Sequence, residues 1–148
     1  MEGRYFPTFL PAVDHPEQLS PLALAYVGDA VLELYVRTYL LYTGRQNVHA
    51  LHKKAVQYVN ASAQANLLKK LKDGLSPEEL GIAKRGRNAK SGHLPKNADV
   101  LDYRFSTGLE CLIGYLYLKG DYQRLDEIFK ILQGLVDEGE REFAGKTD

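Results

Sequence analysis

The sequence has little of several features that place a protein in a special class. It contains one cysteine, Cys111, which excludes an intrachain disulfide and fits a reducing compartment. Its N-terminus lacks the basic segment and apolar core of a secretory signal. No apolar run is both long enough and free enough of charge to cross a bilayer. We therefore expect a cytoplasmic protein that does not associate with membranes.

Net charge is also absent, since 19 acidic residues balance 19 basic ones. The distribution of charge is more informative than its sum. Residues 84–97 contain five bases and no acid, whereas residues 121–148 contain eight acids and four bases. A polyanion would meet the first segment as a basic patch. The sequence has no phosphate-binding Gly-rich loop, nucleophile elbow or dinucleotide fingerprint.

The 148 residues have the length and the 45% hydrophobic content of one globular domain. Caps and apolar periodicity predict an all-α fold of about five to seven helices around two buried central helices. We expect an extended lead-in at 1–19, the domain at 20–139 and a frayed tail at 140–148. The predicted helices run from Pro21 to about Thr43, from Val48 to about Lys72, from Pro77 to near Asn88, from Asn97 or Asp99 to Lys119, and from Asp121 to Gly139.

The two central helices each carry an acid near a glycine. Asp29 follows Gly28, and Glu110 lies four residues before Gly114. If the helices cross at the glycines, the carboxylates could face each other and would repel unless a cation lay between them. Mg²⁺ fits such a pair, because it binds one or two carboxylates and keeps water and phosphate oxygens as its other ligands. The alternative is that each acid pairs with an arginine or with a donor at a helix end.

Other candidate ligands have simpler interpretations. Glu33 could be a third metal ligand, but its spacing favours a salt bridge to Arg37 four residues on. His49 and His52 lack matching cysteines or histidines and are interpreted as surface residues. Cys111 is interpreted as a core residue.

The basic segment is the second functional signal. Its bases alternate with small and amide residues, which suits contacts to backbone phosphates, although a merely solvated loop would have a similar composition. Arg104 is a weaker candidate. The candidate nucleic-acid-binding residues are Lys84, Arg85, Arg87, Asn88, Lys90, Ser91, Lys96, Asn97 and Arg104.

Several motifs together resemble those of a known enzyme family. The run from Leu24 to Glu33, LAYVGDAVLE, resembles the signature motif of the ribonuclease III catalytic domain, and Glu110 with Gly114 is similar to its second acidic motif. The stretches LALAYVGDA, LHKKA, KRGRNAKSG, PKN and YRFST resemble the Mini-III ribonucleases, a short bacterial branch without a separate double-stranded-RNA-binding domain.

The resemblance implies an all-α endonuclease that works as a homodimer and cuts both strands of an RNA duplex. It assigns Asp29 and Glu110 as the Mg²⁺-binding catalytic acids and precursor 23S ribosomal RNA as the substrate. Larger family members have further acids at the positions of Leu22, Ala25 and Thr107, so the resemblance implies a site with fewer protein ligands here. An auxiliary ribosomal protein is a further partner to consider. The alternative function is a non-catalytic RNA-binding or ribosome-assembly protein on the same fold.

Overall fold

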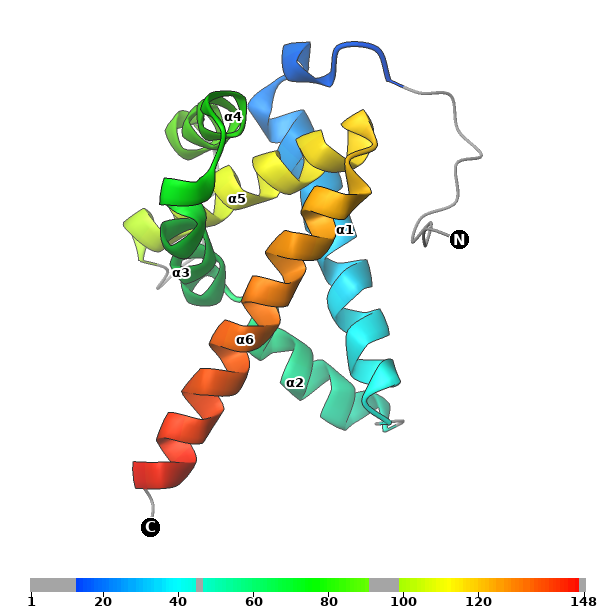
Figure 1. The fold of residues 1–148 in the computed structure, drawn as a ribbon, viewed down its shortest axis with the longest axis vertical. Coiled ribbons are helices and arrows are strands. Elements are labelled where there is room, and N and C mark those ends of the chain that lie inside the picture. The colour runs from blue at the N-terminus through cyan, green and yellow to red at the C-terminus, as the bar shows by residue number, and fades with distance from the viewer. Residues whose placement is uncertain (1–12, 45–46, 91–98, 147–148) are drawn as a thin grey trace.

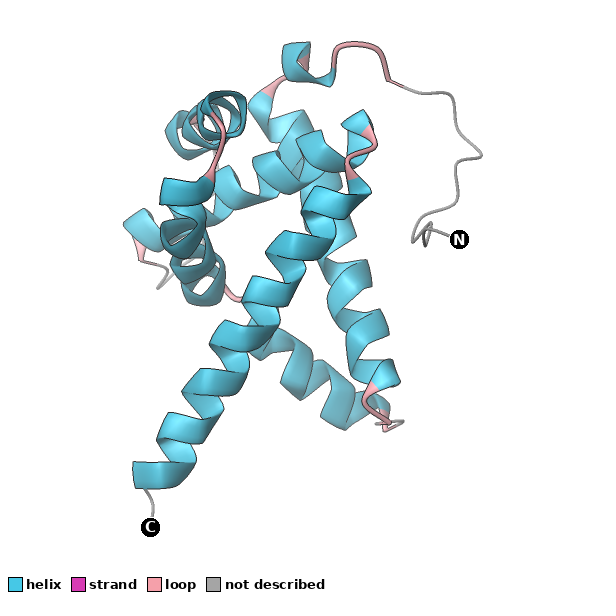
Figure 2. Ribbon diagram, viewed as in Figure 1, coloured by secondary structure: helices cyan, strands magenta, loops and turns pink. Residues whose placement is uncertain are grey.

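Helices and short turns make up the described part of the chain, which comprises residues 13–44, 47–90 and 99–146 of a computed structural model (Figure 2). Within these ranges no strand occurs, and the all-α prediction is confirmed. The elements in order are η1 (Pro16–Gln18), α1 (Pro21–Tyr42), α2 (Val48–Val59), α3 (Ala61–Leu71), η2 (Lys72–Gly74), α4 (Pro77–Asn88), α5 (Val100–Lys119) and α6 (Tyr122–Lys146). Helix η1 lies within the lead-in that the sequence predicted to be extended.

Local capping fixes three helix starts where the sequence predicted them. The Ser20 hydroxyl accepts a hydrogen bond from the Ala23 amide and begins α1. Ser76 and Glu79 form a reciprocal capping box at the start of α4. Asp99 caps α5, and the alternative cap Asn97 lies outside the described residues. Side-chain oxygens at these positions satisfy amides that have no partner within the helix.

The predicted helix over Val48–Lys72 is wrong in one respect, because Asn60 divides it into α2 and α3. Its backbone is extended, with φ −68° and ψ 160°. Its side-chain amide donates to the Val56 carbonyl at 2.9 Å, and its carbonyl oxygen accepts from the Ala63 amide at 2.8 Å. One side chain therefore ends α2 and begins α3, while the apolar periodicity on both sides resembles that of a single helix.

The last helix is longer than predicted. We expected it to end at Gly139 and residues 140–148 to fray, but α6 continues to Lys146. A glycine inside a helix costs only about 1 kcal/mol relative to alanine and does not end a helix by itself. In Figure 1, the C-terminal turns of α6 extend away from the other helices.

Helix α5 is the centre of the core, with α1, α3 and α4 packed around it (Figure 1). Four of its aliphatic side chains, Leu109, Leu112, Ile113 and Leu116, are almost completely buried. Each such side chain contributes about 1.5–3 kcal/mol to folding. Along the described residues, no helix is long and apolar enough to span a membrane.

Candidate active site

The two central helices cross at a pair of glycines, which is the arrangement that the sequence analysis considered for bringing the two acids together. A Cβ atom on Gly28 would overlap the carbonyl oxygen of Glu110 and lie 2.9 Å from the amide nitrogen of Gly114. A Cβ atom on Gly114 would overlap the carbonyl oxygen of Leu24. The backbones of α1 and α5 are therefore in direct contact, which only glycine at both positions permits. This contact brings Asp29 and Glu110 to the same crossing.

The carboxyl groups of Asp29 and Glu110 lie close enough to influence each other. Glu110 is half-buried, and burial first, then the charge of Asp29, raises its pKa to about 8. Burial and the charge of Glu33 raise the pKa of Asp29, although its side chain is exposed. The pair therefore favours one proton or one cation.

No cation of the protein neutralises this pair among the described residues. Arg37 instead forms the salt bridge to Glu33 that the sequence favoured, with Nε 3.2 Å from Oε2. Arg104 is exposed and makes no ion pair within the described chain. The alternative in which arginines partner the two acids is not what the structure shows.

The donor set suits a hard divalent cation with few protein ligands. Within the described ranges, no group of three or more histidines, cysteines or acids is placed so that it could hold a metal ion. Ala25 and Thr107 are buried, and the Thr107 hydroxyl donates to the Tyr103 carbonyl at 3.1 Å. Two carboxylates without a basic partner fit Mg²⁺, which completes its shell with water and phosphate oxygens.

The predicted RNA-binding residues do not all lie on one free surface. Lys84, Asn88 and Lys90 are exposed at the end of α4, and Arg87 is partly exposed beside them. Arg104 is exposed on α5. Three predicted members lie outside the described residues, namely Ser91, Lys96 and Asn97.

Arg85 differs from the others because its guanidinium is already engaged. It donates to the carbonyl of Glu17 at 2.6 Å and to that of Leu19 at 3.0 Å. These bonds hold the chain that leads into α1 against α4. This structural role of Arg85 could not be predicted from the local sequence, since the acceptors are backbone atoms more than 60 residues away.

Cys111 and the histidines have the places that the sequence predicted. Cys111 is fully buried, and its thiol donates to the Pro21 carbonyl at 2.8 Å. Burial raises the pKa of this thiol to about 12, so it is not a reactive thiolate. His49 and His52 are exposed.

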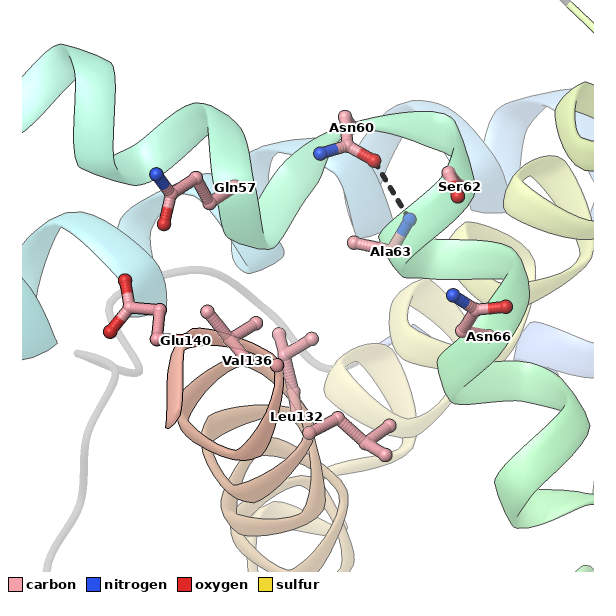
Figure 3. Close-up of a pocket in the computed structure, with 10 residues that line it drawn as sticks. Gln57, Asn60, Ser62, Ala63, Asn66, Leu132, Val136 and Glu140 are labelled. Carbon is pink, nitrogen blue, oxygen red and sulfur yellow. Dashed lines mark hydrogen bonds between the residues drawn. The ribbon is translucent and has the colours of Figure 1, made fainter. Parts of the chain in front are cut away.

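Sequence reasoning missed two hollows. The larger has a volume of about 550 Å³ and lies between the α2–α3 corner and α6. Figure 3 shows its amide wall, with Gln57, Asn60 and Asn66, facing the aliphatic side chains of Leu132 and Val136. It includes neither carboxylate of the crossing, and the acid at its edge, Glu140, forms an ion pair with Lys54. It offers no chemistry comparable to the acid pair.

The smaller hollow has a volume of about 130 Å³ and lies between α3, α4 and α5. Four basic side chains contribute to its lining, one from α3, one from η2 and two from α4. The Lys69-Lys70 doublet and Lys72 were the available sequence signal, but our interpretation used only the apolar periodicity of this segment.

Known proteins share both the sequence and the fold of this chain. The Ribonuclease III domain matches residues 22–121. The Mini-ribonuclease 3 of Brevibacillus brevis is 50% identical over 123 residues, covering 80% of this chain and 92% of the relative. The Mini-ribonuclease 3 of Clostridium tetani is 46% identical over 123 residues, covering 82% of each chain.

A crystal structure of a Fusobacterium nucleatum protein superposes with a TM-score of 0.73. It is 35% identical and covers 78% of this chain and 93% of its own. Sequence and fold thus agree, and the predicted ribonuclease III-type fold is confirmed.

Proposed function

The chain belongs to the ribonuclease III domain family, with Mini-ribonuclease 3 proteins as its relatives, and from this premise we propose that it cleaves double-stranded RNA using Mg²⁺ held by Asp29 and Glu110. Membership makes it an endoribonuclease with RNA as its substrate. Enzymes of this family generally depend on a divalent metal ion.

One observation carries the proposal: two acids share the α1–α5 crossing without a basic partner among the described residues. Asp29 and Glu110 would hold the ion and keep it at a fixed place relative to both helices. When bound, the ion would supply charge stabilisation at the scissile phosphate and lower the pKa of an attacking water. The two carboxylates would orient that charge, because the glycine contact fixes the backbones that carry them.

The RNA duplex would lie against the exposed polar side chains at the end of α4. Lys84, Arg87, Asn88 and Lys90 have the charges and amides that contact phosphates and 2′-hydroxyls. Arg104 would extend this surface onto α5. Ser91, Lys96 and Asn97 belong to the same proposal on sequence grounds alone. We leave Arg85 out, because its donors already hold the backbone at residues 17 and 19.

We further propose that the enzyme acts as a homodimer through α1. Tyr26 is 83% exposed on this helix, and Leu22 and Leu34 are 45% and 50% exposed. Apolar side chains exposed together on one helix are typical of an interface. Tyr35 and Tyr39, on the same helix, instead contact Phe129 and Tyr58 within the chain.

The acid pair is tested with a long RNA duplex and a single-stranded control, each with Mg²⁺ and with EDTA. We expect the wild type to cut only the duplex and only with Mg²⁺. Asp29→Asn and Glu110→Gln should lower the cleavage rate by about 100-fold or more, the scale for losing one charge-stabilising group, and retain RNA binding. Asp73→Asn, an exposed acid on η2, is the matched control and should cleave normally. Equal cleavage by Asp29→Asn would contradict the proposed role.

The natural substrate that we propose is precursor 23S ribosomal RNA, which rests on the resemblance to the Mini-III branch. Cleavage of a duplex formed by the ends of that precursor is compared with cleavage of an unrelated duplex of equal length. The comparison separates an enzyme specific for the precursor from a nuclease that cuts any duplex. We expect cleavage at a defined position only in the precursor duplex. Scattered cuts in both duplexes would argue for a nuclease without this preference.

A further inference from the structure

The smaller hollow, between α3, α4 and α5, combines an apolar floor with a basic rim. Leu75, Leu80 and the partly exposed Phe105 are among its apolar residues. The residues that meet behind it are in close contact, since a Cβ on Gly108 would lie 3.3 Å from a Leu68 methyl group. The floor is therefore a fixed part of the helix packing.

The rim consists of four cations, Lys69, Lys72, Lys84 and Arg87. None of them forms a salt bridge with an acid in the described part of the chain. No acid is among the residues that line the hollow. Lys69 lies over the Phe105 ring, with Nζ 5.4 Å from the centroid. The rim is thus uniformly positive, and the ammonium group of Lys69 lies over one face of the aromatic ring.

The size of the hollow limits what can enter it. A volume of about 130 Å³ is well below the roughly 300–1,000 Å³ of sites that enclose a whole small molecule. It suits one flat ring with the rest of the ligand outside. An apolar surface for a ring and cations for the flanking charges are the features that proteins use to bind single-stranded nucleic acid.

The position of the hollow separates it from the acid pair. Phe105 and Glu110 lie five residues apart on α5, which places them about 140° apart around the helix. A nucleotide in the hollow therefore cannot be the one that Asp29 and Glu110 act on. Lys84 and Arg87 belong to both the hollow and the proposed duplex surface, so the two surfaces adjoin on α4.

We propose that this hollow holds one unpaired nucleotide of the RNA, in a single strand that continues from the duplex. The base lies against Phe105 and Leu80, and the neighbouring phosphates contact the four rim cations. The proposal rests on the proposed function, in that it assumes that the duplex binds near the end of α4. An acidic peptide would match the rim but would leave the aromatic floor without a matching group, so RNA is the better occupant.

The test uses the full chain without divalent ions and a short oligouridylate as the probe. We expect Phe105→Leu, which removes the ring and keeps apolar bulk, to weaken oligouridylate binding about fivefold or more. Phe105→Tyr keeps a ring and should bind like the wild type. Lys69→Ala should lower the slope of log affinity against log salt by about 0.7, the value for one phosphate contact to a single strand. Lys70→Ala, on the same helix but outside the hollow, should change neither quantity.

Three results would overturn the proposal. They are equal oligouridylate binding by wild type and Phe105→Leu, loss of binding by Phe105→Tyr as well, and amide NMR shifts that leave residues 69, 80 and 105 unmoved. An oligoglutamate peptide that displaces the probe and binds more tightly would assign the hollow to an acidic protein partner instead. Cleavage of a blunt duplex by the wild type is measured separately, so its failure would count against the proposed function and not against the hollow.

Discussion

Glu110 holds the proton of the acid pair because its side chain is the more buried of the two. Asp29 is exposed, so water stabilises its charge, whereas Glu110 is half-buried beside it. The pKa of Glu110 rises from 4.5 to about 8 for this reason. In the metal-free protein at neutral pH, the pair therefore carries mainly one negative charge.

This shift predicts how the stability of the metal-free protein depends on pH. Glu110 binds a proton more tightly in the folded state than in the unfolded state. The contribution of this protonation to stability is therefore complete below about pH 4.5 and is lost as pH rises through about 8. In EDTA, we expect the free energy of unfolding to fall by about 1–3 kcal/mol between those values, after allowance for solvent screening.

Urea titrations at several pH values measure this fall. Glu110→Gln should flatten the curve, whereas Glu138→Gln, an exposed residue on α6, should leave it as in the wild type. A wild-type curve as flat as that of Glu110→Gln would show that the pKa of Glu110 is not raised in the folded protein.

At the scale of single residues, the sequence identified both acids of the candidate site but not the role of every basic residue. An acid beside a glycine in an apolar helix is a local pattern, and both Asp29 and Glu110 could be found by it. Arg85 looks locally like its neighbours Lys84 and Arg87, yet it binds the carbonyls of Glu17 and Leu19. Only the fold brings those acceptors to it.

At the scale of helices, the glycine crossing determines how closely α1 and α5 approach. Gly28→Ala would place a methyl group onto the Glu110 carbonyl, and neither backbone can move without displacing the core. We expect a loss of about 3 kcal/mol or more in the free energy of unfolding, at the upper end of overpacking effects. Gly114→Ala should behave alike, since its methyl group would meet the Leu24 carbonyl.

Gly81→Ala is the matched control for these changes. Gly81 lies in α4 with no atom within 4 Å of its added methyl group. This substitution should raise stability by up to about 1 kcal/mol, because alanine loses less backbone entropy in a helix. Denaturant titrations of the three variants measure the difference. Equal stability of Gly28→Ala and Gly81→Ala would show that the helices do not touch at the crossing.

The boundaries of helices were less predictable than their existence. Asn60 has the residue type of an N-cap, but the apolar positions before and after it keep one helical phase, so the break between α2 and α3 was not evident. At Gly139 the error was the reverse, because glycine is typical of helix ends and α6 nonetheless continues. The side-chain hydrogen bonds of Asn60 decide the first boundary, and the residue type of Gly139 does not decide the second.

Across the whole molecule, Arg124 joins three segments. From α6, its Nε donates to Glu79 of α4 at 2.8 Å, and its Nη2 donates to the Gly74 carbonyl at 3.1 Å. Glu79 is only 8% exposed. Arg124→Ala would leave that carboxylate buried without its cation, and we expect a loss of about 2–4 kcal/mol, somewhat below the range for a completely buried pair.

The control is Lys130→Ala on the same helix. Lys130 is exposed and lies 3.9 Å from Asp126, so its loss should change stability by less than about 0.5 kcal/mol. Thermal unfolding of both variants makes the comparison. A similar small effect for the two would mean that α4 and α6 are held together by apolar packing alone.

The proposed homodimer predicts the effect of a charge on α1. Tyr26→Asp should weaken self-association tenfold or more, the scale of a central interface residue. Tyr42→Asp adds the same charge at the far end of the helix, where the tyrosine is 91% exposed, and should have a smaller effect. Sedimentation velocity across a concentration series measures both. A wild type that remains monomeric at the highest concentration would contradict the dimer.

The contact between Gly28 and Gly114 also separates two properties that usually change together. The distance between the acid-bearing backbones depends on main-chain atoms in contact, and no core side chain acts as a spacer between them. Truncating a distant aliphatic residue, such as Leu132, should therefore reduce the fraction of molecules that are folded without altering the turnover of those that remain folded. Core side chains therefore determine how much of the protein is folded, while the backbone contact determines the geometry of the acid pair.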